Sequence, residues 1–332
     1  MFQHLQQFEK DDVSVGSLIG NGSFYDIFDV SLSKICLKRQ KKYGTTGDSN
    51  LDEPVVLKKI KGLNYYDGKQ NTAYLNLVHE TDLLSSLNHR NIIKIHGSGQ
   101  QFLGSTSGQQ YFIVIGRIKY TLEKQLRIWH TDETSCDGVE IPTHRRNKEL
   151  NTRLKVAVSI ASALSYLHSQ DIVFRDLKPS NIGFDFKGEV KLIDFQSAIE
   201  IKPDTTINHF YGSPRYMAPE VYRRNDYKFP VDVYSFGILL WEIYTLKKPY
   251  RDLSLKTLRR KVIEGYRPKL QTHWSMTLKN VMTASWNYNP IKRPSISTIH
   301  KVLQNETIGT QELFSKRQTR SLLKAIRKRR LQ

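Results

Sequence analysis

The chain has 332 residues with 51 Lys and Arg against 32 Asp and Glu, which gives a formal charge of +19 at pH 7. Hydrophobic residues make up 39% and charged residues 25%, so a wholly disordered or fibrous chain is excluded. The longest apolar stretch, from Phe236 to Tyr244, contains Glu242 and is too short to span a bilayer. Two cysteines, Cys36 and Cys136, cannot form a multi-bridge framework and fit a reducing compartment. We therefore expect an intracellular, cytoplasmic protein.

Much of the excess positive charge lies in two segments. Residues 34–42 carry five Lys and Arg, and residues 316–330 carry eight, with no acidic residue after Glu312. In this basic C-terminal tail, Leu322, Leu323 and Ile326 recur at helical spacing. The tail fits an anionic partner, a membrane surface or nuclear import, and equally a solvated chain end.

The first third of the chain is predicted to be rich in strands. Short β-prone runs cover residues 13–19, 25–30, 34–38, 55–60 and 111–118, and one helix-like pattern from Leu75 to Leu87 interrupts them. Polar segments at residues 44–53, 97–110 and 130–147 are expected to be loops.

The remainder is predicted to be mainly helical. Apolar residues recur with helical spacing between Leu154 and Leu167, and residues 231–244 are apolar nearly all round, which is typical of a buried helix. The order of these elements predicts an α+β protein with a small β-rich lobe followed by a larger helical lobe.

Two features of the β-rich part are suited to phosphate binding. Gly20 and Gly22 lie between two strand-like runs, where a tight turn can bring backbone N–H groups close to phosphate oxygens. Lys58 lies in an apolar strand and needs a polar partner for its ammonium group, either a phosphate or a carboxylate such as that of Glu80. Each feature alone also fits an ordinary turn and an ordinary strand lysine.

A second group of polar residues follows the helix that ends near Leu167. Asp176, Lys178 and Asn181 fall within six residues, and Asp194 comes at the end of the next strand-like run. Carboxylate and amide oxygens are hard ligands, so Asn181 and Asp194 are candidate ligands of Mg²⁺.

With these motifs in this order, the chain resembles a eukaryotic-type protein kinase over roughly residues 11–303. The resemblance is supported by three further segments, which are Gly212–Glu220 (GSPRYMAPE), Asp232–Gly237 (DVYSFG) and Arg293–Ser295 (RPS). It implies a bilobal kinase fold with a small β-rich N-lobe and a larger α-helical C-lobe. The implied divisions are an extension at 1–10, a kinase domain at 11–305 and the tail at 306–332. Within the domain, the N-lobe covers about 11–115, the hinge about 115–118 and the C-lobe about 119–305.

The resemblance also implies roles for the candidate residues, with ATP and Mg²⁺ as cofactors. Asp176 would accept the proton of the substrate hydroxyl, and Lys178 would lie beside the transferred phosphoryl group. Asn181 and Asp194 would hold Mg²⁺. The residues that would bind the nucleotide are Gly20, Asn21, Gly22, Ser23, Ile27, Lys58 and Glu80.

The implied function is Mg²⁺-dependent transfer of the γ-phosphoryl group of ATP to Ser or Thr of protein substrates, and no specific nucleic-acid binding is expected. Lys178-Pro179-Ser180 resembles Ser/Thr kinases, whereas the segments after Asp232 and Trp286 are similar to the tyrosine-kinase-like branch.

Three positions depart from the pattern of the family. Phe174 stands in place of His, Gln196 in place of Gly, and Tyr25 in place of the third loop glycine. They leave open an alternative function as an inactive pseudokinase that serves as an ATP-binding scaffold.

Overall fold

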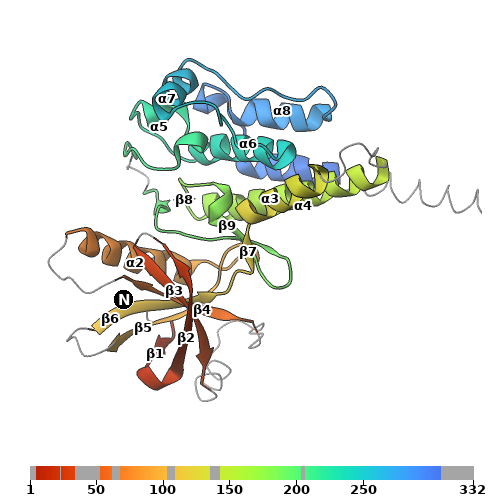
Figure 1. Ribbon diagram of the computed structural model, residues 1–332. Coiled ribbons are helices and arrows are strands. Elements are labelled where there is room, and N and C mark those ends of the chain that lie inside the picture. The colour runs from red at the N-terminus through yellow and green to blue at the C-terminus, as the bar shows by residue number, and fades with distance from the viewer. Residues whose placement is uncertain are drawn as a thin grey trace, which may run out of the picture. The chain divides into compact units, whose positions relative to one another are not determined.

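The computed structural model describes residues 5–22, 24–33, 53–61, 68–102, 109–134, 143–202 and 206–307. The chain forms two compact units, whose elements are traced in Figure 1. The first unit comprises Met1–Leu122 and Ser180–Ala198, and the second comprises Glu123–Pro179 and Ile199–Gln332. The first contains the large sheet and the second most of the helices, which confirms the predicted α+β class. The chain returns to the first unit over Ser180–Ala198, a segment that the predicted boundaries place in the helical lobe.

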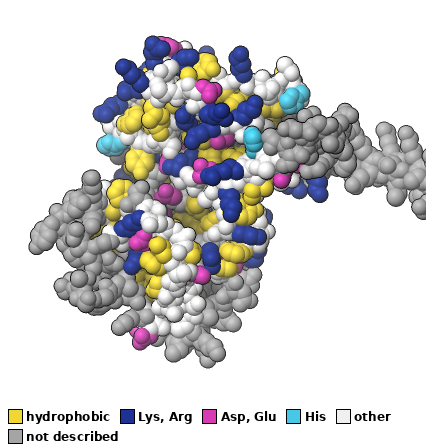
Figure 2. All heavy atoms as spheres, in the orientation of Figure 1, with side chains coloured by type: hydrophobic (Ala, Val, Ile, Leu, Met, Phe, Trp, Pro, Cys, Tyr) yellow, Lys and Arg dark blue, Asp and Glu magenta, His cyan; other side chains and the backbone are white. Residues whose placement is uncertain are grey.

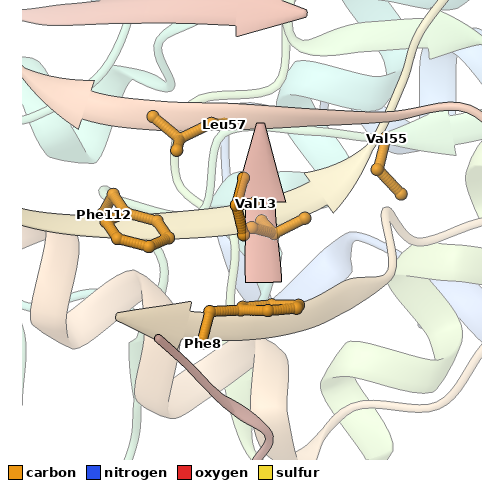
Figure 3. Close-up of a cluster of buried hydrophobic side chains, with 6 residues drawn as sticks. Phe8, Val13, Val55, Leu57 and Phe112 are labelled. Carbon is orange, nitrogen blue, oxygen red and sulfur yellow. The ribbon is translucent and has the colours of Figure 1, made fainter. Parts of the chain in front are cut away.

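The first unit is built on a six-stranded sheet. Its strand order is β1(Gln7–Phe8), β5(Ile95–Phe102), β6(Gln109–Gly116), β4(Val55–Ile60), β3(Tyr25–Leu32) and β2(Val13–Asn21). β1 pairs with β5 in parallel and the other neighbours are antiparallel. Side chains from the two edge strands, β1 and β2, and from the strands between them form one buried cluster. Its residues are Phe8, Val13, Val55, Leu57, Phe112 and Val114 (Figure 3). Part of the segment expected as an extension, residues 1–10, therefore belongs to the sheet, and the 3₁₀ turn η1(Lys10–Asp12) links it to β2.

The prediction of a loop at residues 97–110 is wrong for Gly97 to Phe102, which lie in β5, and for Gln109 and Gln110, which begin β6. Residues 103–108 lie outside the described residues. A Cβ atom at Gly99 would come within 2.6 Å of the Phe8 carbonyl oxygen and of the Phe112 ring, and one at Gly97 would collide with Phe8 as well. The glycines are therefore required by the close approach of β1 and of the aromatic rings, and not by a turn.

Helix α2(Gly68–Ser86) contacts β4, β5 and β6, which confirms the helix predicted around Leu75 to Leu87. A small sheet with the order β10(Val190–Leu192), β9(Ile182–Phe184) and β7(Tyr120–Thr121) completes the first unit, together with the 3₁₀ turn η2(Pro179–Asn181) at its boundary.

The second unit is organised around the buried helix α6(Pro230–Thr245), which was predicted from its continuous apolar sequence. The elements that contact α6 are α4(Thr143–Ser169), α8(Met276–Ser285), η3(Pro214–Tyr216) and η4(Pro290–Lys292). The remaining elements are α3(Leu122–Thr134), β8(Ile172–Val173), β11(Ile199–Glu200), α5(Pro219–Tyr222), α7(Leu255–Ile263) and a helix over residues 296–307. Among the described residues, no helix is both long enough and apolar enough to cross a membrane.

Several predictions concern residues outside the described ranges. These are the strand at 34–38, the loop at 44–53 except Glu53, Ser23 of the glycine-rich turn, and the basic tail from residue 308 onward. The loop expected at 130–147 is helical at both ends, where α3 and α4 extend into it, and its centre at 135–142 is not described.

Candidate functional site

The first unit contains a buried ion pair between Lys58 on β4 and Glu80 on α2. The Lys58 Nζ atom donates a hydrogen bond to Glu80 Oε2 at 2.6 Å, and the two side chains are 8% and 0% exposed. Removing two charges from water is costly unless they are paired and hydrogen-bonded. The mutual partnership of Lys58 and Glu80 therefore explains why both charges can occupy the interior.

Glu80 also connects this pair to the segment that carries Asp194. Its second oxygen, Oε1, accepts a hydrogen bond from the Phe195 backbone N–H at 3.3 Å. Asp194 Oδ1 lies 3.9 Å from Lys58 Nζ. This oxygen is buried and has no hydrogen-bond partner among the described residues. An unsatisfied carboxylate oxygen beside an ammonium group is a suitable ligand for a cation that is itself bound to phosphate.

Asn181, the other predicted metal ligand, is held in the same unit. It is buried, and its backbone carbonyl accepts a hydrogen bond from the Ile193 N–H at 3.0 Å, one residue before Asp194. The described residues contain no cluster of three or more His, Cys, Asp or Glu side chains that could hold a metal alone. An amide and a carboxylate nevertheless fit Mg²⁺, which commonly takes one or two protein ligands and completes its shell with phosphate and water.

Strand register aligns three of the predicted nucleotide-binding residues. Gly20 pairs with Ile27 across β2 and β3, and Ile27 pairs with Lys58 across β3 and β4. A Cβ atom at Gly20 would lie 3.3 Å from the Cβ atom of Ile27, so glycine keeps this row of the sheet closely packed. The register thus places Gly20, Ile27 and Lys58 in one row across three neighbouring strands.

The turn between β2 and β3 is closed by its own backbone. The Gly22 N–H donates to the Tyr25 carbonyl oxygen at 3.0 Å. The Asn21 side chain is hydrogen-bonded to Lys61, whose ammonium group also lies 3.8 Å from Asp26 Oδ1. The structure therefore associates the Asn21 side chain with Lys61, the residue that follows β4.

Tyr25 is a site residue that stands out in the sequence only as a departure from the family pattern. Its side chain is buried, its hydroxyl donates to the Ala73 carbonyl oxygen at 2.8 Å, and Lys58 Nζ lies 4.8 Å from the centre of its ring. A large aromatic residue at a position where the family has glycine is the signal that could have suggested a packing role.

In the second unit, both oxygens of the Asp176 carboxylate have partners. Lys178 Nζ donates to Oδ2 at 2.7 Å, as their spacing of two residues allows, and Ser213 Oγ donates to Oδ1 at 2.7 Å. The contact with Ser213 joins residues 37 positions apart and was not predicted. A carboxylate with an adjacent ammonium can accept a proton from a hydroxyl and stabilise the charge that develops on the reacting groups.

Asp232 holds the backbone that leads to Asp176. It is fully buried on α6 and accepts hydrogen bonds from the N–H groups of Phe174 and Arg175, each at 2.8 Å. The His168 Nε2 atom lies 2.9 Å from Asp232 Oδ2. Phe174, which replaces the histidine of the family, is fully buried, and Arg175 has a positive φ of 67°. These contacts support a conformation that a non-glycine residue adopts only at an energetic cost.

Glu220 and Arg293 form a second buried ion pair. Arg293 Nη1 and Nη2 donate to the two Glu220 oxygens at 2.5 Å and 2.8 Å, and Arg293 Nε donates to the Asn287 carbonyl oxygen at 2.9 Å. The bidentate geometry fixes the segment after η3 against η4.

Gln196 does not occupy a backbone conformation that requires glycine. The positive φ in this segment, 65°, belongs to Asp194, and Gln196 is not among the non-glycine residues with positive φ. In this conformation the replacement of Gly by Gln therefore introduces no backbone strain of its own.

A family model and several known proteins match more than half of this chain. A family model described as the protein kinase domain matches residues 45–306. The *Dictyostelium discoideum* protein named "Probable serine/threonine-protein kinase mkcF" is 29% identical over 287 residues, which cover 86% of this chain and 37% of that protein. The *Arabidopsis thaliana* serine/threonine/tyrosine-protein kinase HT1 is 30% identical over 226 residues, which cover 68% of this chain and 53% of that protein. The matched part thus spans about half or less of the length of these relatives.

Proposed function

Because the chain belongs to the protein kinase family, we propose that it transfers the γ-phosphoryl group of ATP to Ser and Thr hydroxyls of protein substrates. The observation that carries the proposal is that the chain keeps two groups of residues: the ion pair of Lys58 and Glu80 with Asp194 Oδ1 at 3.9 Å from the ammonium group, and the Asp176 carboxylate with its partner Lys178. An ATP-binding scaffold would need only the first group, whereas phosphoryl transfer needs both.

The nucleotide is bound by the first unit. Lys58 contacts the α- and β-phosphates and is held in place by Glu80, while the backbone of the turn at Gly20 and Gly22 covers the phosphates. Asn181 and Asp194 would hold Mg²⁺, which would supply positive charge to neutralise the phosphate oxygens.

The hydroxyl substrate is activated by the second unit. The oxygen of a substrate Ser or Thr forms a bond to the γ-phosphorus as the bond to the β–γ bridging oxygen of ATP breaks, and ADP leaves. Asp176 accepts the hydroxyl proton on its carboxylate, and Lys178 stabilises the negative charge on the transferred group.

The specificity for Ser and Thr and the similarity to the tyrosine-kinase-like branch belong to the same proposal. The specificity is supported by Lys178-Pro179-Ser180, by the segment from Gly212 to Glu220 and by the name of the mkcF relative, and the similarity to the branch by the segments after Asp232 and Trp286. The alternative of an inactive pseudokinase is less well supported, because none of the replacements at Tyr25, Phe174 and Gln196 removes a charged group of the site.

Transfer of ³²P from ATP and Mg²⁺ to a peptide array tests the activity and the specificity together. The wild-type protein is expected to label Ser- and Thr-containing peptides, and Asp176→Asn is expected to lose nearly all of this labelling. Equal labelling by both proteins would remove the enzymatic function, and phosphoamino-acid analysis dominated by phosphotyrosine would overturn the specificity.

The basic tail is proposed to contact an anionic partner or a membrane surface, and a cytoplasmic location is proposed for the protein. The support for the tail contact is the charge and helical spacing of residues 316–331, and the support for the location is that Cys36 and Cys136 fit a reducing compartment. Truncation after Phe314 is expected to change the location in cells; an unchanged location would favour a solvated tail.

A further inference from the structure

The second unit contains a cavity of about 880 Å³ whose lining is rich in positive charge. It is lined by α3, the C-terminal end of α6, the segment from Leu246 to Leu253, and residues 266–269. The Lys and Arg side chains that line it are Arg127, Lys247, Lys248, Arg251 and Lys269. Figure 2 shows that Lys and Arg side chains gather over the helical unit on the face in view.

The wall of this cavity is connected directly to Asp176 through the turn η3. Ser213, which precedes η3, donates to Asp176 Oδ1 at 2.7 Å. Two residues later, Arg215 Nη1 donates to the Pro249 carbonyl oxygen at 3.1 Å and contacts the Tyr250 carbonyl oxygen. Within two positions of the chain, η3 therefore links a residue that contacts Asp176 to one that contacts the cavity lining.

Tyr216, the last residue of η3, contacts a second residue of the cavity lining. Its hydroxyl donates to Glu242 Oε2 at 2.6 Å, and Glu242 lies in the cavity lining. Glu242 is buried, and burial raises its pKa from 4.5 to about 7. At pH 7 this carboxyl group is therefore about half protonated and offsets only part of the surrounding positive charge.

The other two acidic residues of the lining have basic partners within it. Glu123 Oε2 lies 3.4 Å from Arg127 Nη2, and Asp252 Oδ1 lies 3.7 Å from Arg251 Nε. Both pairs are exposed, so the charges are screened and cancel within the lining.

The positive charge that remains in the lining comes from three lysines, Lys247, Lys248 and Lys269. All three side chains are exposed, and no acidic group lies within 4.0 Å of their ammonium groups among the described residues. Of these, Lys248 interacts electrostatically with Glu242, which is only partly ionised at pH 7. Three ammonium groups in one lining favour a ligand with several negative charges. The basic tail of the chain has the wrong charge to occupy the cavity.

We propose that this cavity binds acidic residues that flank the phosphorylated Ser or Thr of a protein substrate, so that the enzyme selects acidic peptides. The inference rests on the proposed function and specifies its substrate class. Apolar side chains in the lining, including Trp241 and Tyr266, provide surfaces for the peptide backbone and methylene groups between the charges. A peptide fits better than a nucleic acid because the cavity adjoins the turn that contacts Asp176.

The test compares two peptides with the same Ser, one flanked by Asp and Glu and the other by Ala. With wild-type protein, the KM of the acidic peptide is expected to be about tenfold lower, and the difference should shrink at 0.5 M salt. The variant Lys247→Glu/Lys248→Glu should raise the KM of the acidic peptide about tenfold while kcat and the KM of the Ala peptide stay unchanged. The matched control, Lys256→Glu/Lys301→Glu, changes two exposed lysines outside the cavity and should behave as wild type.

Binding of the fluorescently labelled acidic peptide, measured by anisotropy, keeps this inference separate from the proposed function. If no peptide were phosphorylated, the proposed function would fail, while loss of binding in Lys247→Glu/Lys248→Glu alone would still support the cavity as the acidic site. Equal affinity for the acidic and Ala peptides, equal loss in both double variants, or displacement of the peptide by single-stranded RNA with tighter binding would overturn the inference.

Discussion

The Tyr25 hydroxyl donates a hydrogen bond to the Ala73 carbonyl oxygen at 2.8 Å, and this contact joins β3 to α2. The ring of Tyr25 lies below Lys58, whose Nζ is 4.8 Å from its centre, and α2 carries Glu80 seven residues after Ala73. One side chain therefore fixes the helix that supplies the carboxylate and also supports the ammonium group. Tyr25, which interrupts the glycine pattern, therefore helps to hold Lys58 and Glu80 in position for their ion pair.

Removal of the Tyr25 hydroxyl is expected to loosen this arrangement. Tyr25→Phe keeps the ring but leaves the Ala73 carbonyl oxygen without this donor, a loss of about 1 kcal/mol. The KM for ATP should rise about fivefold, with a smaller effect on the KM of the peptide substrate. Tyr25→Gly, which restores the glycine of the family, should be worse because it also removes the ring beneath Lys58.

The control for this experiment is Tyr74→Phe, which removes a hydroxyl from a partly exposed ring on the same helix. It should leave the KM for ATP unchanged. An ATP KM in Tyr25→Phe equal to that of wild type, or a gain of activity in Tyr25→Gly, would contradict the positioning role of Tyr25.

The relation between sequence and structure differs from one part of the site to another. The approximate positions of β4 and α2 follow from hydrophobic periodicity, and the partnership of Lys58 with Glu80 follows from the family pattern. The contacts of Tyr25 and Ser213 could not be predicted, because each joins segments that are distant in sequence and has no local pattern. β5 was not predicted for a related reason. Its glycines are required by close packing against Phe8 and Phe112, but in the sequence alone they look like turn residues.

The buried pair predicts a specific pattern of stabilities. Lys58→Met leaves the buried Glu80 carboxylate without its partner, which should lower the free energy of unfolding by about 3–5 kcal/mol. The double variant Lys58→Met/Glu80→Gln removes the uncompensated charge, so urea unfolding should show that much of this loss is recovered. Neither variant should transfer phosphate. Equal destabilisation in the single and double variants would show that the cost comes from packing and not from the unpaired charge.

The unpaired oxygen of Asp194 predicts a thermal response to nucleotide and metal. Saturating ADP with Mg²⁺ should raise the Tm of the wild-type protein by roughly 5 °C, because a ligand that binds only the folded state stabilises it. Asp194→Asn should abolish the part of this increase that depends on Mg²⁺, as measured with EDTA in place of the metal. Asp185→Asn, which changes an acidic residue elsewhere in the first unit, is the control and should retain the response. A response that does not depend on Mg²⁺ in wild type would contradict the assignment of Asp194.

The carboxyl group of Glu242 predicts how stability depends on pH. Burial raises its pKa from 4.5 to about 7, so between these values the folded state holds a proton that the unfolded state has released. The contribution of Glu242 to stability is therefore present below pH 4.5 and is lost as the pH rises through 7. One pKa unit corresponds to about 1.4 kcal/mol, so the loss amounts to about 3 kcal/mol.

Glu242→Gln should remove this dependence, because the amide oxygen can still accept the hydrogen bond from Tyr216 and carries no charge to bury. Urea unfolding should show that, between pH 5 and pH 8, the free energy of unfolding of the wild type falls by about 3 kcal/mol more than that of the variant. Glu264→Gln, an exposed position on the second unit, provides the control and should follow the wild-type profile. If wild type and Glu242→Gln lose stability in parallel between pH 5 and pH 8, Glu242 is ionised in the fold and must then repel acidic peptides from the cavity that it lines.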